Sequence, residues 1–341
     1  MSLTPLDAAG TARWAELEAF PPYGFYRDLD DAACRRYRAR QLASMAGNTA
    51  HAAFTWHGEG DGAVDSEAAF GLTSLGWDTE QFGVLAGRLD YLIVAPKSGG
   101  TPATDPRNTA ANRRVLAVAT EAARAMTAEA DRRGLKHLSA RVDSRELPVL
   151  QALERNGFEL VDAILRFSLD ASEWGGAPAL PAGVKLRDAV ESDVEVLGAL
   201  SAKGFLYDRF HNDPMLADGV ADRVHAAWLA NAVRGKAGDG VLVAEVDGRP
   251  AGFFILALDK LAGETLGKTI GTLVLITVDG TLRRRGVALA LSLGSIDWLK
   301  ERGADRFEVG TQLANVPAAN VYLKAGFRLV NTSVSLRRMA S

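Results

Sequence analysis

The sequence predicts a mixed α/β fold built as two tandem domains. The chain has 341 residues and 48% of them are hydrophobic, which is longer than one typical domain and enough for ordinary buried cores. Residues 171–183 place two prolines and three glycines between two strand-like segments, a composition typical of linkers. We therefore expect domains at residues 1–170 and 184–341, joined by the linker 171–183.

The first half shows a strand pattern over Arg88–Val94 and a long helical pattern over Asn112–Arg133. Between them, Ala95 to Ala110 is rich in Gly, Pro and Thr and is expected to form a loop.

The second half alternates strand and helix patterns, which is typical of a mixed sheet. Three β-rich segments separated by turn signals such as Asp247-Gly248 predict a meander. The expected elements are strands at Val184–Ala189, Val241–Val246, Ala251–Leu258, Gly271–Val278, Arg306–Gln312 and Arg328–Leu336, and helices at Ser192–Lys203, Val220–Val233, Gly286–Arg302 and Pro317–Lys324.

The two halves share a spaced pattern of glycines. Residues 134–138 and 156–158 match residues 303–307 and 325–327 in spacing, and both stretches end in Gly-Phe. Any strand-helix-strand unit can end its helix with glycine and restart with an aromatic residue. A repeat of whole domains is the simplest account.

Composition restricts the partners and the compartment. Lys and Arg total 39 against 42 for Asp and Glu, so no global attraction to nucleic acid is expected. Cys34 is the only cysteine, which excludes an intramolecular disulfide and a Cys-rich metal site. Without a long apolar run or a targeting pattern, we expect a soluble cytoplasmic protein without a membrane partner.

A strand end, an arginine-rich turn and a helix start follow one another at residues 276–289. Gly286 lets the backbone approach an anion, and small Ala288 avoids crowding it. Three arginines, residues 283–285, are unfavourable at the positive end of a helix unless an anion binds there. The pattern favours a pyrophosphate site, and a solvated basic turn is the alternative.

A second motif, Asn315-x-x-Ala318-x-x-x-Tyr322-x-x-x-Gly326-Phe327, follows the first. The pair resembles the GNAT superfamily of N-acetyltransferases, and residues 184–341 look like a whole domain of it. The resemblance implies that acetyl-CoA is the co-substrate and that no metal is needed. It assigns to acetyl-CoA the residues Ile276, Thr277, Val278, Arg283, Arg284, Arg285, Gly286, Val287, Ala288, Leu289 and Asn315.

The resemblance also implies a catalytic acid. Tyr322 would protonate the departing CoA thiolate, because a phenol with an ordinary pKa of about 10 still carries its proton near neutral pH. A core aromatic residue is the alternative. Many relatives carry a glutamate base five residues before the motif asparagine, where this chain has Gly310. Glu308, His211 or an amine that arrives neutral are the substitutes.

Residues 207–214, together with Trp228, residues 311–315 and residues 75–83, resemble the TDP-fucosamine acetyltransferase branch of the superfamily. Enzymes of this branch acetylate the 4-amino group of a TDP-linked dideoxysugar. This resemblance implies that Arg209, His211, Asp213 and Trp77 contact the substrate. The alternatives are an Asp-Pro turn in which Arg209 pairs with Asp213, a helix cap for His211, and a core position for Trp77.

The first half lacks the residues of both motifs. At the repeat spacing, Leu153 stands in the place of Tyr322, Glu146 in that of Asn315 and Ala117 in that of Gly286. We therefore expect residues 1–170 to be a degenerate copy that does not bind CoA in the usual way.

The expected function is acetyl transfer from acetyl-CoA to a primary amine by direct attack, with an amino sugar on a nucleotide as the favoured acceptor and a homodimer as one possible assembly. The alternatives are another amine, such as an aminoglycoside, a polyamine or a protein N-terminus, and a non-catalytic acyl-CoA-binding protein.

Overall fold

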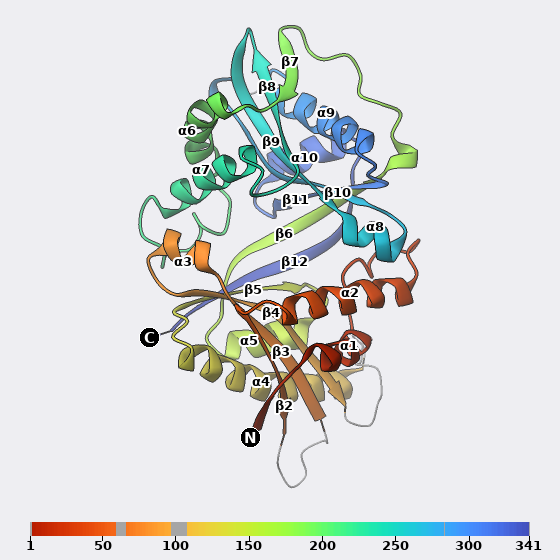
Figure 1. Cartoon of the computed structure of the whole chain (residues 1–341), viewed down its shortest axis with the longest axis vertical. Helices are drawn as coiled ribbons and strands as arrows, with labels where there is room; N and C mark the ends of the chain where they lie inside the picture. Colours follow the sequence, from red (N-terminus) through yellow and green to blue (C-terminus); the bar gives the residue numbers. More distant parts are fainter. Residues whose placement is uncertain (1, 59–65, 97–107, 283, 341) are drawn as a thin grey trace. The chain divides into compact units, whose positions relative to one another are not determined.

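The computed structural model describes residues 2–58, 66–96, 108–282 and 284–340. The chain divides into two compact units (Figure 1). Unit 1 comprises Met1–Ala163 together with Thr332–Ser341, and unit 2 comprises Ile164–Asn331. Each unit is a mixed sheet with helices on both faces, so the predicted fold class is confirmed.

Unit 1 orders its strands β1-β2-β3-β4-β5-β12. Two apolar clusters cover the faces of this sheet, one under α4 and α5 and the other under α1 and α2. Its elements are β1 (Ser2–Pro5), α1 (Ala8–Leu17), α2 (Asp31–Ala46), β2 (His51–His57), β3 (Ser66–Ser74), α3 (Gly76–Phe82), β4 (Ala86–Pro96), α4 (Thr109–Arg132), β5 (His137–Asp143) and α5 (Leu147–Arg155).

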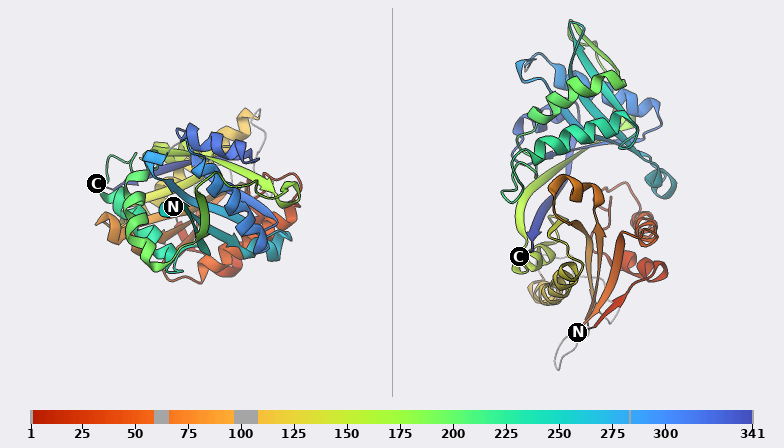
Figure 2. Two further views of the ribbon diagram at one scale, coloured as in Figure 1. Left: turned by 90° about the horizontal axis from the view of Figure 1, so that it is seen from above. Right: turned by 60° about the vertical axis from the view of Figure 1, so that its left-hand side comes forward.

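Unit 2 orders its strands β6-β11-β10-β9-β8-β7. Helices α6 and α7 cover one face and α9 and α10 the other (Figure 2). Its elements are β6 (Glu159–Asp170), β7 (Val184–Asp188), α6 (Val194–Gly204), α7 (Val220–Val233), β8 (Gly240–Val246), β9 (Arg249–Asp259), α8 (Lys260–Leu266), β10 (Ile270–Val278), α9 (Val287–Glu301), β11 (Arg306–Gln312), α10 (Val316–Lys324) and β12 (Arg328–Met339).

The internal repeat is confirmed in the structure. The strand of 7 residues, helix of 9 and strand of 12 at β5, α5 and β6 recur with the same lengths at β11, α10 and β12. In both units, α5 and α10 carry a proline in the first turn, where its missing N–H costs nothing.

The last strand of each repeat is shared between the units. The first residues of β6 belong to unit 1, but Ile164–Asp170 pair with β11 in unit 2. In the same way β12 starts in unit 2, and Ser333–Met339 pair with β5 in unit 1. The boundaries of the compact units therefore lie inside these two strands and differ from the predicted boundaries at 170 and 184.

The expected linker, residues 171–183, is held against α9. Trp174 Nε1 donates to Asp297 Oδ1 at 2.6 Å, and the Ala177 N–H donates to the other oxygen of that carboxylate at 3.2 Å. The Trp174 ring also packs against the core of unit 2. The segment lacks long regular structure, as predicted, but hydrogen bonds fix its path within unit 2.

The observed elements match the sequence expectations closely in the second half. The helix Val220–Val233, the strand Arg306–Gln312 and the antiparallel meander β8-β9-β10 have the predicted positions. In the first half only β4, α4 and the strand-helix-strand unit of the repeat (β5, α5 and β6) were expected. Most of the expected loop Ala95 to Ala110 lies outside the described residues.

The two long helices begin differently at one position that the repeat spacing relates. Ala117 was aligned with Gly286, which precedes the first turn of α9. The structure places Ala117 inside α4, because that helix begins at Thr109 after the Asn108 side chain accepts the Ala111 N–H. The long helices of the two units therefore agree at their C-terminal ends but begin at different points.

Among the helices of the described residues, none combines the length and the apolar character that crossing a membrane requires.

Candidate active site

The candidate site of unit 2 begins where β10 and β11 separate. Their parallel pairing covers only Ile270–Leu273 and Arg306–Val309. Beyond it, β10 carries a bulge between Leu273 and Leu275 in its register with β9, and a bulge bends and twists a strand. The backbone of residues 276–278, predicted to hold the pantetheine arm, lies in this separated part of β10.

The turn after β10 presents backbone N–H groups. Asp279 Oδ1 accepts from the Thr281 N–H and hydroxyl, each at 2.8 Å, which closes the turn. Arg284 and Gly286 both adopt left-handed φ angles, 62° and 80°. Among the described residues, which do not include Arg283, no side chain caps α9. Its first N–H groups and its positive dipole end are therefore available to an anion.

The predicted phosphate residues differ in exposure. Arg284, Arg285 and Gly286 are exposed, and Arg285 Nη2 lies 3.7 Å from Asp247 Oδ2. Val287 is buried in the core, whereas Ala288 and Leu289 are partly buried. Arg283 lies outside the described residues.

Asn315 is the N-cap of α10, and Tyr322 lies at the end of its second turn. Asn315 Oδ1 accepts the Ala318 N–H at 3.3 Å, so this side chain caps the helix while its amide nitrogen remains a donor. Tyr322 is 2% exposed and lies edge-on to Phe167 and Phe327. Burial raises the pKa of Tyr322, which keeps its hydroxyl protonated.

Glu308 is buried on β11 and faces away from the cluster that holds Phe307 and Val309. Its Oε2 lies 2.5 Å from Arg166 Nη1 on β6. This ion pair already engages the carboxylate that was considered as a base.

The end of α6 lies directly against β10. A β-carbon on Gly204 would stand 1.8 Å from Thr277 Oγ1, a distance that only glycine avoids. Residues 207–214, which were expected to contact the substrate, therefore follow directly after the part of α6 that lies beside the strand predicted to hold the cofactor.

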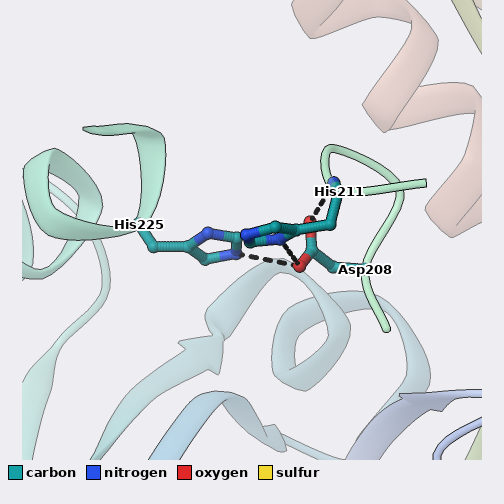
Figure 3. Close-up of side chains that lie close together, drawn as sticks. All are labelled: Asp208, His211 and His225. Carbon is teal, nitrogen blue, oxygen red and sulfur yellow. Dashed lines mark hydrogen bonds and ion pairs between the residues drawn. The ribbon is translucent and has the colours of Figure 1, made fainter. Parts of the chain in front are cut away.

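His211 belongs to a cluster with Asp208 and His225 (Figure 3). Asp208 Oδ2 lies 2.6 Å from His211 Nδ1 and 3.9 Å from His225 Nε2. Phe205 stacks on the His225 ring at 4.1 Å. Burial lowers the pKa of His225, which favours its neutral form.

Sequence reasoning did not single out His225. It lies on α7, which starts only at Val220, so no helical spacing links it to His211. Only the path of residues 205–219 brings the two rings within stacking distance, at 5.7 Å between centroids.

The other residues predicted to contact substrate occupy separate places. The Arg209 guanidinium lies over the Phe210 ring at 4.6 Å. Asp213 is buried, and its Oδ1 accepts the Met215 N–H at 3.0 Å. Trp77 lies in α3 of unit 1 and is partly buried.

The corresponding positions of unit 1 carry different chemistry. Glu146 precedes α5 without capping it through its side chain, and Leu153 is fully buried where unit 2 has Tyr322. At these positions unit 1 has neither the phenol nor the amide.

Comparison with known proteins agrees with this geometry. Residues 207–327 match the model of the acetyltransferase (GNAT) family. The aminoglycoside N(6')-acetyltransferase type 1 of Klebsiella aerogenes is 32% identical over 113 residues, which are 32% of this chain and 74% of the relative. The chain belongs to the GNAT family.

This GNAT protein is also similar to mycothiol acetyltransferases. A mycothiol acetyltransferase of Clavibacter sepedonicus is 31% identical over 175 residues, 51% of this chain and 53% of the relative. The chain thus spans about half the length of the curated mycothiol acetyltransferases it matches. Neither name belongs to the TDP-fucosamine branch.

The tandem GNAT architecture is also found in a solved structure. A tandem GNAT protein from the clavulanic acid biosynthesis pathway superposes with a TM-score of 0.53 at 16% identity, covering 100% of this chain and 98% of the other. At that identity the likeness concerns the fold.

Proposed function

We propose that unit 2 transfers an acetyl group from acetyl-CoA to a primary amine of a small molecule, by direct attack in a ternary complex. The observation that carries this proposal is the separation of β10 from β11 beside the open N-terminus of α9. In the proposed complex the pantetheine arm pairs with residues 276–278. The pyrophosphate accepts hydrogen bonds from the backbone N–H groups of residues 284–289. The side-chain amide of Asn315 donates a hydrogen bond to the cofactor.

The reaction needs only groups on this unit. The amine nitrogen attacks the thioester carbon, and a strand N–H near Val278 stabilises the oxyanion. When the intermediate collapses, the C–S bond breaks and the Tyr322 hydroxyl donates its proton to the leaving thiolate. The proton that the nitrogen loses as the amide forms returns to Tyr322 through water. The raised pKa of Tyr322 keeps this donor protonated through the physiological pH range.

No side chain is assigned to remove the amine proton. Glu308 is engaged by Arg166, and the amine enters neutral or loses its proton to water. His211 remains the alternative base, because Asp208 orients its ring.

The acceptor belongs, in this proposal, to the class of amines that the relatives' names indicate. Those names are mycothiol acetyltransferase and aminoglycoside N(6')-acetyltransferase. A TDP-linked amino sugar is a narrower candidate, favoured by the resemblance at residues 75–83, 207–214, Trp228 and 311–315. Arg209 and Asp213 are the proposed contacts within unit 2.

The test combines titration and turnover. Isothermal titration of the full chain with acetyl-CoA should show one site, and an acceptor screen at fixed acetyl-CoA should rank aminoglycosides, TDP-amino sugars, polyamines and peptides. Fastest turnover of a peptide would exclude the small-molecule proposal, and fastest turnover of a TDP-amino sugar would select the narrower one.

The second candidate function is acyl-CoA binding without turnover. Gly310 in place of the expected base and the ion pair of Glu308 favour it. Tight acetyl-CoA binding with no acetylation of any amine would select this function over the enzyme.

A further inference from the structure

Three side chains that the proposed reaction does not require converge beside the C-terminal end of α6. Asp208 and His211 come from the segment between α6 and α7, and His225 from the second turn of α7 (Figure 3). One oxygen or nitrogen from each lies within 4.8 Å of the others. Asp208 and His225 are buried, whereas the His211 side chain is 25% exposed, which leaves a path to solvent.

The outer nitrogen of each ring has an acceptor. His225 Nδ1 lies 2.8 Å from the Ala221 carbonyl oxygen, so this nitrogen carries the ring proton and donates. His211 Nε2 lies 3.2 Å from Asp222 Oδ1, which also accepts. Metal-bound histidines show this arrangement, in which the outer N–H donates to a carbonyl or carboxylate and the inner nitrogen faces the metal.

The inner atoms of the cluster are then all lone-pair donors. Asp208 Oδ1 is occupied by the N–H groups of Phe210 and His211, at 2.9 and 3.3 Å, so Oδ2 faces the two rings. A second proton on His211 would satisfy its 2.6 Å contact with Oδ2. It would still leave His225 Nε2 facing that oxygen at 3.9 Å, beyond hydrogen-bond range.

We propose that Asp208, His211 and His225 bind one divalent transition-metal ion, with Zn²⁺ as the best match. Two imidazoles and one carboxylate form a common zinc set, and bond lengths of about 2.0 to 2.2 Å separate tetrahedral ligands by about 3.3 Å. The Asp208–His211 contact of 2.6 Å must open by about 0.7 Å, and the Asp208–His225 contact of 3.9 Å must close by about 0.6 Å. The ligand atoms of the two histidines lie within 4.8 Å of each other and must close by up to about 1.5 Å, which rotation of the two side chains provides. The fourth position is left for water.

The ion connects a loop to a helix at a place that matters for the acceptor. Residues 205–219 directly follow Gly204, the last residue of α6, which lies against Thr277 of β10. A metal that ties Asp208 and His211 to α7 would fix this segment near β10, beside the pantetheine site of the proposed function. His211 would then have no free Nδ1 lone pair, so this role and that of a catalytic base exclude each other.

The test titrates ZnCl₂ into the metal-stripped full chain by calorimetry. One equivalent should bind to the wild type, and the affinity should fall at least tenfold in His225→Gln and Asp208→Asn. Asp218→Asn, an exposed acid of the same segment, should bind like the wild type. Zn²⁺ should raise the melting temperature of the wild type and of Asp218→Asn but not of the two ligand variants.

Asp222→Asn covers the case in which a ligand variant does not fold. Its side chain is 50% exposed, so the fold should survive, while loss of the outer hydrogen bond should weaken Zn²⁺ binding by about 10 to 100-fold. A wild type that binds no Zn²⁺, or variants that bind it unchanged, would overturn the proposal. If His211→Gln loses turnover while Zn²⁺ has no effect on the wild type, the metal site would be rejected and His211 would be assigned as the catalytic base.

Discussion

Tyr322 combines a structural position with a proposed chemical one. Its ring fills the core between Phe167 and Phe327, and the phenol has the raised pKa expected of a buried group. The two interpretations open at the sequence level, core aromatic and catalytic acid, are therefore compatible. Only removal of the hydroxyl separates them, because phenylalanine keeps the packing.

Tyr322→Phe should lower kcat by about 10² to 10⁴-fold, since it removes the proposed proton donor to the thiolate. Acetyl-CoA affinity and stability should change little. Steady-state kinetics at saturating acetyl-CoA measure this effect. Tyr91→Phe is the matched control, because Tyr91 is a buried tyrosine of unit 1 whose hydroxyl has no partner among the described residues. Equal turnover in both variants would remove the acid assignment.

Glu146 makes the stability of unit 1 depend on pH. Burial, followed by the nearby carboxylates of Glu18 and Asp143, raises the pKa of Glu146 to about 8. The unfolded chain has a glutamate pKa of about 4.3, so the folded state favours the protonated form. Stability contributed by this group is full below about pH 4 and is lost as pH rises toward 8.

Glu146→Gln should therefore remove part of the loss of stability between pH 5 and pH 8. Urea unfolding at both pH values measures the difference, with hydrogen exchange in α4 reporting on unit 1. Glu154→Gln, an exposed glutamate on α5, serves as the control and should follow the wild type. An identical pH slope in the wild type and Glu146→Gln would contradict the raised pKa of Glu146.

At the scale of elements, α9 offers a matched pair of glycines. Gly286 and Gly303 flank the helix and have similar left-handed φ angles, 80° and 86°. An alanine is strained at either position, at a cost of about 1 to 2 kcal/mol. Only Gly286 lies at the end that is proposed to hold the pyrophosphate.

Gly286→Ala should weaken acetyl-CoA binding, whereas Gly303→Ala should lower stability without changing the affinity. A β-carbon at Gly286 would also approach Pro181 Cγ to 3.2 Å, while Gly303 has open space. Isothermal titration of both variants, with urea unfolding alongside, makes the comparison. Equal affinity in the two variants would place the cofactor elsewhere.

Local sequence patterns predicted the helices and strands of unit 2 well where glycine or turn residues mark their ends. Gly326 and Gly303 end helices, and the Asp247-Gly248 turn separates β8 from β9. The same reasoning missed α1, α2 and β2, because the turn and cap residues that mark their ends form weaker patterns. It could not find the partnership of Asp208, His211 and His225, because that depends on the path of a loop rather than on spacing.

At the scale of the whole molecule, β6 and β12 each run from one unit into the other. Residues that are close in sequence on these strands therefore belong to the cores of different units. Leu169 lies before the expected linker, yet it is buried in the core of unit 2. Leu336 lies near the end of the second repeat, yet it is buried in the core of unit 1. Local patterns could not predict this exchange, because strand pairing is decided by long-range contacts.

Leu169→Ala should destabilise unit 2, and Leu336→Ala should destabilise unit 1, each by about 2 to 5 kcal/mol. Hydrogen exchange should rise in α9 for Leu169→Ala and in α4 for Leu336→Ala. Each variant is the other's control, since both remove the same atoms from a nearly inaccessible strand position. Increased exchange in α4 for Leu169→Ala, with α9 unchanged, would contradict the observed pairing.

The shared strands also set an order of events during synthesis on the ribosome. Unit 1 cannot complete its sheet until Ser333–Met339 have emerged, after all of unit 2 has been translated. At about 5 to 20 residues per second, β5 waits on the order of 10 to 40 seconds for that neighbour. During this interval one edge of β5 is unpaired, so a nascent chain would benefit from a chaperone that shields it.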